Sequence, residues 1–325
     1  MLYIVTSLVV NYSRNMMQNS ISIVTPIYKD HYLINDFVSA IKQIPNINLH
    51  EIIFVSDGGG DDDEAFLDSI CEKESLVKSI IFSRNFGQHI ALSAGYNLSS
   101  GDLVCMLNVD QQDPPSEILK LVSELENNNY DIVYGLRTLR KDGWLKIISS
   151  KAFNWVLNKM TGDNTPLNVS TMRLMSRRFI EHYNELTEKS RYLPGLENWI
   201  GFKRGYIAIE HQERKEGDSS YTFIKRINMA VNSIIGFSDL PLRWASFIGM
   251  LISLLGFGSL LVLLFLKLYI IDFRPGYIST IAVILFVGGI QILVVGLASL
   301  YIGRILKEVQ DRPLYIIKKK INFNV

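Results

Sequence analysis

Acidic, amide and glycine residues gather in three short polar clusters, and each cluster follows an apolar run that is rich in isoleucine and valine. The clusters are PIYKD at 26–30, SDGGGD at 56–61 and NVDQQDPP at 108–115. Carboxylate and amide oxygens are the ligands that hard divalent cations prefer, and glycine lets a ligand approach the backbone closely. The clusters therefore predict a site that binds a charged ligand through a cation or a nucleoside through hydrogen bonds.

Other common sites are not indicated. Four acidic side chains at 61–64 follow the glycine run, where a Walker-type phosphate loop would carry a lysine, and neither GxxxxGK[ST] nor GxGxxG occurs. We expect these acids to favour the start of a helix through its dipole. The five histidines, at 31, 50, 89, 182 and 211, have no spacing suited to zinc, so we expect surface or capping roles for them.

The elements that must position the clusters alternate between strand and helix patterns. Short apolar runs predict strands at 21–25, 51–55, 77–82, 103–107 and 131–134. Helix-period segments separate these runs near 33–43, 62–73, 88–98 and 116–127. This order predicts an α/β, Rossmann-like fold with a mostly parallel sheet, in which the three clusters share one edge.

After Arg243 the composition changes to two long apolar segments. Residues 244–270 and 278–302 are nearly free of charge, and each exceeds the roughly 20 residues that cross a bilayer. Arg304, Lys307 and Arg312 follow the second segment, so the positive-inside bias places both ends of this hairpin in the cytoplasm. Glycines in the two segments permit close helix packing between subunits, and hence a homo-oligomer.

These patterns divide the chain into parts with different expected structures. We expect an N-terminal extension (1–20), an α/β domain (21–220), a juxtamembrane amphipathic helix region (221–243), two transmembrane helices within 244–303 (244–270 and 278–302) and a basic cytoplasmic tail (304–325).

The overall charge does not indicate a nucleic-acid partner. The 33 basic and 32 acidic residues give a net charge of +1, so no global field attracts a polyanion. The two cysteines, Cys71 and Cys105, lie in apolar surroundings without a CxxC pattern, and we expect reduced core thiols.

Residues 21–243 resemble family 2 glycosyltransferases, in the group of the dolichol-phosphate mannose synthases and bactoprenol glucosyltransferases. The matching stretches, in the family's order, are TPIYKD at 25–30, EIIFVSDGGGDD at 51–62, SRNFGQHIALSAGYNLSSGD at 83–102, NVDQQDPP at 108–115, YDIVYGLRTLR at 130–140, MRLMSRR at 172–178 and RKEGDSSY at 214–221. FSDLPLRWASFIG at 237–249, before the paired apolar segments, is similar to the polyprenyl-phosphate glucosyltransferase branch.

The resemblance implies a GT-A fold and assigns roles to matching positions. It places five residues at the nucleoside: Pro26, Tyr28, Asp30, Asp57 and Asn108. It makes Asp110 and Arg214 catalytic, and it gives Asp110 and Gln112 to a Mg²⁺ or Mn²⁺ ion that binds the diphosphate. It places five residues at the acceptor or its phosphate: Arg137, Lys151, Arg173, Ser219 and Tyr221. A solvated helix face is the alternative for Lys151, and a structural salt bridge is the alternative for Arg173.

The sequence departs from the family pattern at three positions. Asn108 stands where the family has the first acid of its DxD motif, Ser56 replaces the first acid of DDGS, and Ser220 replaces a lysine. Asparagine brings no charge, so metal affinity is lower than in relatives or Asp113 partly substitutes; the sequence leaves both open.

The resemblance implies an inverting, metal-dependent transfer of sugar from a nucleotide-sugar, with UDP favoured, to polyprenyl (undecaprenyl) phosphate for cell-surface glycan modification. The enzyme would be a multi-pass protein of the bacterial inner (cytoplasmic) membrane with its catalytic domain in the cytoplasm. The alternatives are a membrane-anchored family 2 transferase that extends a lipid-linked oligosaccharide and a catalytically silent membrane scaffold. A polymer synthase would carry a QxxRW-type motif, which is absent.

Overall fold

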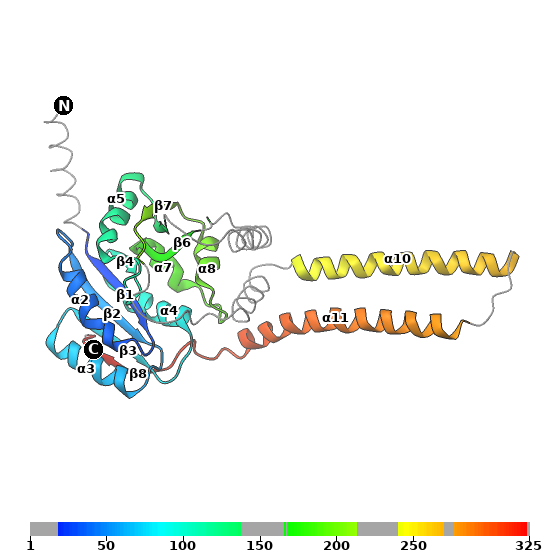
Figure 1. The fold of residues 1–325 in the computed structure, drawn as a ribbon, viewed down its shortest axis with the longest axis horizontal. Coiled ribbons are helices and arrows are strands. Elements are labelled where there is room, and N and C mark those ends of the chain that lie inside the picture. The colour runs from blue at the N-terminus through cyan, green and yellow to red at the C-terminus, as the bar shows by residue number, and fades with distance from the viewer. Residues whose placement is uncertain (1–18, 138–165, 167, 213–239, 270–275, 324–325) are drawn as a thin grey trace, which may run out of the picture. The chain divides into compact units, whose positions relative to one another are not determined.

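The structure is a computed structural model, and it describes residues 19–137, 166, 168–212, 240–269 and 276–323 (Figure 1). The chain forms two compact units. The first contains a mixed sheet with its covering helices, and the second contains two long apolar helices.

The sheet of the first unit has eight strands among the described residues, in the order β7-β5-β6-β4-β1-β2-β3-β8. The strands are β1 (Ile21–Ile27), β2 (Leu49–Ser56), β3 (Val77–Phe82), β4 (Leu103–Met106), β5 (Ile132–Arg137), β6 (Val169–Ser176), β7 (Arg204–Ile209) and β8 (Ile317–Ile321). The four strands β4, β1, β2 and β3 are parallel neighbours. Strand β6 runs antiparallel to β4 and β5, and β8 runs antiparallel to β3.

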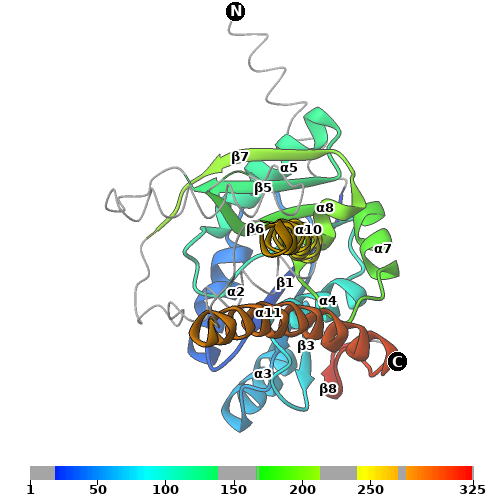
Figure 2. The same ribbon diagram turned by 90° about the vertical axis from the view of Figure 1, so that its right-hand side faces the viewer.

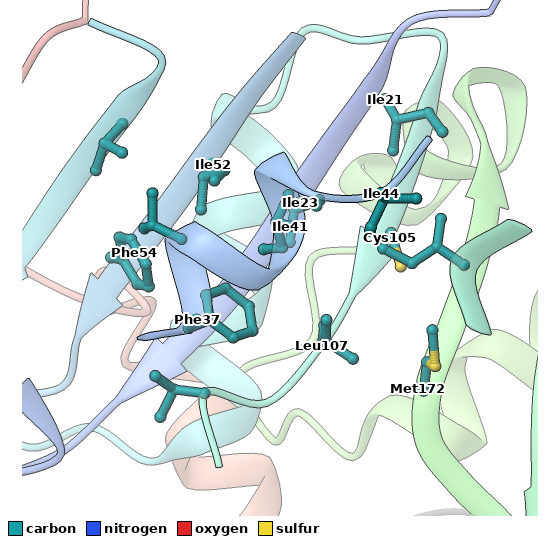
Figure 3. Packing of buried hydrophobic residues seen from close by; sticks show 14 of the residues in the cluster. Ile21, Ile23, Phe37, Ile41, Ile44, Ile52, Phe54, Cys105, Leu107 and Met172 are labelled. Atoms are coloured by element: carbon teal, nitrogen blue, oxygen red, sulfur yellow. The ribbon is translucent and has the colours of Figure 1, made fainter. Parts of the chain in front are cut away.

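Helices cover both faces of the sheet. The helices are α2 (Ile34–Lys42), α3 (Asp61–Lys73), α4 (Gln88–Leu98), α5 (Ile118–Asn128), α7 (Arg177–Glu185) and α8 (Leu193–Ile200), with short 3-10 turns at His31–Leu33 and Pro115–Glu117. On one face, Phe37 and Ile41 of α2 pack over Ile23 and Ile52 (Figure 3). On the other face, α4 lies so close to β1 that a Cβ at Gly95 would stand 2.3 Å from Val24 Cγ1. Two covered faces explain why the strands read as continuous apolar runs.

The predicted α/β fold is confirmed, and the first five strands and four helices lie where their patterns placed them. Strands β6, β7 and β8 were not predicted. Both cysteines are free and buried, as expected.

The C-terminal residues differ from the expected basic tail. Strand β8, with sequence IKKKI, pairs with β3 and forms an edge of the sheet (Figure 2). Lys318 Nζ lies 2.6 Å from Glu64 Oε2, and Lys319 Nζ lies 2.7 Å from Asp68 Oδ1, both on α3. The lysines therefore attach this strand to an acidic helix of the first unit.

The second unit contains α10 (Leu240–Tyr269) and α11 (Tyr277–Val309). Within them, Leu240–Ser259 and Phe286–Val309 are long and apolar enough to cross a membrane, and neither stretch is buried inside the structure. Core helices of soluble proteins bury such surface, so these exposed apolar helices need lipid or another partner. The juxtamembrane helix expected at 221–243 falls almost entirely outside the described residues.

Candidate active site

The carboxyl ends of β2, β1 and β4 lie next to one another. Strand β1 lies between the other two and is parallel to both. Asp57 N donates to Ile27 O at 3.0 Å, and Leu107 N donates to Val24 O at 3.2 Å. The three polar clusters therefore begin at one edge of the sheet, as the parallel topology requires.

The loop after β1 is held in shape by an acid of the next helix. Lys29 has a φ of 63°, an unusual conformation for a residue with a side chain. Asp63 of α3 is fully buried; its Oδ2 accepts from Lys29 N at 2.9 Å, and its Oδ1 lies 2.9 Å from His31 Nδ1. Tyr28 is 46% exposed, so its ring is available to a ligand. One of the four acids assigned to the helix dipole thus fixes the neighbouring loop.

Asp57 connects the loop after β2 to the loop after β3. Its carboxylate accepts from Phe86 N at 2.6 Å and from Gly87 N at 2.9 Å. Burial raises the pKa of this carboxyl, while the two backbone donors and Arg84 oppose the rise. Gly58 fits tightly beside it, since a Cβ there would lie 2.5 Å from Arg84 C and Asn85 N. Asp57 is only 4% exposed, and the contacts that its side chain makes in the structure fix residues 83–87. Its contact with a nucleotide base stays a prediction.

The loop after β4 presents the amide and carboxylate expected to face the diphosphate. Asn108 Nδ2 donates to Thr171 Oγ1 of β6 at 3.0 Å. Asp110 Oδ1 accepts from Gln112 N at 3.3 Å, and Gln111 between them has a φ of 52°. Asp110 and Gln112 are both partly exposed, so the turn leaves them accessible.

Asp113 is enclosed by donors. Ser170 Oγ donates to its Oδ2, Arg137 Nη2 lies 3.4 Å from the same oxygen, and His211 Nδ1 lies 2.9 Å from Oδ1. Its side chain is only 5% exposed. We call these four residues the Asp113 cluster. A carboxylate occupied in this way is poorly placed to replace the missing DxD acid.

Arg173 occupies a buried ion pair. Its Nη1 lies 2.5 Å from both carboxylate oxygens of Glu197, and Tyr134 Oη donates to Glu197 Oε2 at 2.9 Å. Arg173 is 7% exposed and Glu197 is 1% exposed. The structural salt bridge that the sequence left open is therefore present, and the described structure offers no exposed guanidinium at Arg173 for an acceptor phosphate.

Several assigned residues cannot be placed. Lys151, Arg214, Ser219 and Tyr221 lie outside the described residues, so their roles stay predictions. Pro26 and Asp30 lie at the carboxyl end of β1, as expected. Arg137 ends β5 and contacts Asp113.

Three residues that hold the loops and side chains of the site in place, Asp63, His211 and Glu197, were not predicted from the sequence. In the sequence, Asp63 is equivalent to its acidic neighbours. It differs from them only because the rotation of α3 turns its side chain toward the loop after β1. His211 and Glu197 had no partner within sequence reach, since their contacts are with Asp113 and Arg173, far along the chain.

The donor set decides how a cation would bind. Among the described residues, no group of three or more His, Cys, Asp or Glu side chains could hold a metal ion. Mg²⁺ commonly binds through one or two carboxylates together with substrate phosphates. One carboxylate at Asp110 with an amide at Gln112 therefore fits a cation that arrives with a diphosphate, and does not fit an all-protein metal site.

Comparison with known proteins agrees with this fold. Residues 22–183 match the family described as Glycosyl transferase family 2. A protein named uncharacterized glycosyltransferase YkcC, from Bacillus subtilis, is 34% identical over 92% of this chain and 93% of its own. The undecaprenyl-phosphate 4-deoxy-4-formamido-L-arabinose transferase of Proteus mirabilis is 33% identical over 93% of this chain and 94% of its own. The bactoprenol glucosyl transferase of Shigella phage SfII is 33% identical over 92% of this chain and 97% of its own.

This chain belongs to glycosyltransferase family 2, and it is a glycosyltransferase with the GT-A fold. Its two apolar helices, together with such relatives, associate it with a membrane.

Proposed function

We propose that this protein transfers a sugar from a nucleoside diphosphate sugar to polyprenyl phosphate at the cytoplasmic face of a bacterial membrane. The observation that carries the proposal is the similarity to two transferases named for undecaprenyl phosphate and bactoprenol, which extends over more than nine-tenths of both chains. Such an alignment includes the apolar helices as well as the sheet unit. The favoured donor base is uracil, by resemblance to the bacterial branch.

The site supports a substitution at the anomeric carbon. A phosphate oxygen of the lipid attacks that carbon and forms the new C–O bond, while the bond to the nucleoside diphosphate breaks and its electron pair leaves with the diphosphate. Attack from the face opposite the leaving group inverts the configuration. The phosphate nucleophile is already ionised near neutral pH, so the reaction needs no strong general base.

The described residues would bind and orient the donor. Tyr28 and Asp30 lie at the loop where the nucleoside is expected, on a backbone fixed by Asp63. Asp110 and Gln112 would hold Mg²⁺ or Mn²⁺ against the diphosphate, and that cation would neutralise charge on the leaving group. Arg214, Ser219 and Tyr221 are assigned to the lipid phosphate by resemblance; arginine fits because its planar guanidinium binds phosphate through two hydrogen bonds.

The order of the chain supports a two-span topology. Strand β8 belongs to the same sheet as β1 to β7, although α10 and α11 lie between β7 and β8 in sequence. If α10 crosses the membrane, α11 must cross back for β8 to join the sheet, and this connectivity supports an even number of spans. The basic residues after the second span favour the cytoplasm for the sheet.

The direct test is a donor screen with detergent-solubilised protein, undecaprenyl phosphate and Mg²⁺, read by the mass of the lipid product and, for its anomeric configuration, by NMR. We expect a glycosyl-monophosphate lipid, with the anomeric configuration inverted relative to the donor. A glycosyl-diphosphate product, or transfer only to a preformed lipid-linked sugar, would contradict the proposed acceptor. Activity with a GDP-sugar alone would contradict the uracil base and leave the acceptor supported.

A further inference from the structure

The C-terminal segment, residues 313–323, contacts the loop that Asp57 fixes. Tyr315 stacks on Phe82 at the end of β3, with ring centroids 5.0 Å apart and planes inclined by 15°. Next to it, Ile316 O accepts a hydrogen bond from Ser83 N at 3.0 Å. The segment that follows α11 therefore packs where β3 passes into residues 83–87, which we call the nucleotide loop.

Contacts continue from Phe82 to Asp57. Phe82 meets Phe86 edge to face, with centroids 5.6 Å apart and planes at 86°. Phe86 N donates to Asp57 Oδ1 at 2.6 Å. Phe82 is 2% exposed, so the central ring of this stack is buried, while Phe86 and Tyr315 are partly exposed. The position of Tyr315 is thus linked through two ring contacts to the backbone donor of a candidate nucleotide residue.

The segment is anchored independently of the aromatic contacts. Asn322 Nδ2 donates to Cys71 O at 2.7 Å and to Val77 O at 2.8 Å. Lys318 and Lys319 pair with acids of α3. Removing the Tyr315 ring therefore leaves the pairing of β8 with β3, the hydrogen bonds of Asn322 and the ion pairs of both lysines in place. A Tyr315 variant thus tests the aromatic contact alone.

We propose that Tyr315 is a positioning residue for donor binding. Its ring fixes Phe82 and, through Phe82, Phe86, and this positions the Phe86 and Gly87 N–H groups that donate hydrogen bonds to Asp57. The inference rests on the proposed nucleotide site at these loops. It assigns to the C-terminal segment a role in the reaction besides completing the sheet edge. An aromatic pair contributes about 0.5–1.5 kcal/mol, which is enough to keep a short loop in its binding conformation before the ligand arrives.

The test compares Tyr315→Ala with two matched variants in the full-length protein. Tyr315→Phe keeps the stacked ring, and Lys318→Ala removes an exposed ion pair of the same strand, which contributes little to stability. Hydrogen exchange is measured on peptides that cover residues 83–90, and UDP binding is measured by calorimetry. Of the three variants, we expect only Tyr315→Ala to show faster exchange of the Phe86 and Gly87 backbone amides. It should also bind UDP about 3- to 10-fold more weakly, while kcat and the KM for the lipid stay unchanged.

Unchanged exchange in Tyr315→Ala, or equal acceleration in Lys318→Ala, would overturn the inference. Faster exchange with wild-type UDP affinity would overturn the positioning role. If the wild-type protein does not bind UDP, the donor assignment fails, while the exchange pattern still decides whether Tyr315 fixes the loop.

Discussion

His211 Nδ1 lies 2.9 Å from Asp113 Oδ1, and this contact joins the end of β7 to the loop that carries Asp110. The backbone adds a second link, because Gln212 N donates to Gln112 O at 2.8 Å. The residues that follow, from 213 onward, include Arg214, Ser219 and Tyr221 of the proposed acceptor site. Arg137, also in the Asp113 cluster, directly precedes the segment that contains Lys151.

Replacing Asp113 should therefore impair the acceptor more than the donor. We expect Asp113→Asn to raise the KM for polyprenyl phosphate by about 10- to 100-fold, the effect of losing one charge-assisted contact of about 1.5–3 kcal/mol. The affinity for nucleoside diphosphate should change little. Steady-state kinetics with each substrate varied in turn checks this. A larger loss of donor affinity than of acceptor affinity would place Asp113 in the metal site instead.

The Arg173–Glu197 pair should serve stability. Glu197→Gln leaves a buried guanidinium without its counter-charge, and we expect a cost of about 3–5 kcal/mol in unfolding free energy. The double variant Arg173→Met, Glu197→Gln removes both charges and should regain much of that loss. Denaturant unfolding of the three proteins provides the measurement. Loss of acceptor binding by a folded, stable double variant would restore the phosphate role of Arg173.

Acid should destabilise the protein partly through His89. Burial, together with the positive charge of Arg173, lowers the pKa of His89 from 6.5 to about 4. Between these pH values the unfolded chain binds a proton that the folded chain does not, so stability falls as the pH falls through this window.

We expect His89→Gln to reduce the acid-induced loss of stability by an amount on the order of 1–3 kcal/mol between pH 6.5 and 4. Unfolding at a series of pH values measures it, with His50→Gln as the control at an exposed position. The account fails if both variants keep the parent's slope.

Gly58 should be required for the shape of the nucleotide loop. Its φ is 71°, and a Cβ would lie 2.5 Å from backbone atoms of Arg84 and Asn85. Gly60 provides a control, because its φ of 104° carries a similar conformational cost but no atom lies within 4 Å of its added Cβ. We expect Gly58→Ala to weaken UDP binding about tenfold or more and Gly60→Ala to weaken it much less. Equal losses in calorimetry would show that backbone strain alone is responsible.

The parts of the fold that sequence predicted are those with local signals. Strands β1 to β5 are compact apolar runs, and their alternation with helices placed the three clusters on one edge. Strand β8 has no such signal: three lysines stand between two isoleucines, and the strand is stabilised by acids of α3 and by pairing with β3. Strand β6 carries Arg173, whose burial becomes favourable only with Glu197 present.

The site follows the same division. The parallel topology alone predicted which loops meet. In the structure, Tyr28, Asp30, Asp57 and Asp110 lie in loops that follow neighbouring strands. It did not predict which acids bind backbone donors. Asp57 and Asp63 are turned toward N–H groups of adjacent loops, and this depends on the phase of helices and turns that sequence spacing leaves undetermined.

The most direct measurement is the affinity for UDP with Mn²⁺ and with a chelator, in the wild-type protein and in Asp110→Asn. Asn108→Asp, which restores a carboxylate at the neighbouring loop position, is the matched variant. We predict that Mn²⁺ strengthens UDP binding by about tenfold or more in the wild type, that Asp110→Asn loses this gain while it keeps the metal-free affinity, and that Asn108→Asp increases it. Equal affinity with Mn²⁺ and with chelator in the wild type, or a full Mn²⁺ effect in Asp110→Asn, would contradict the account.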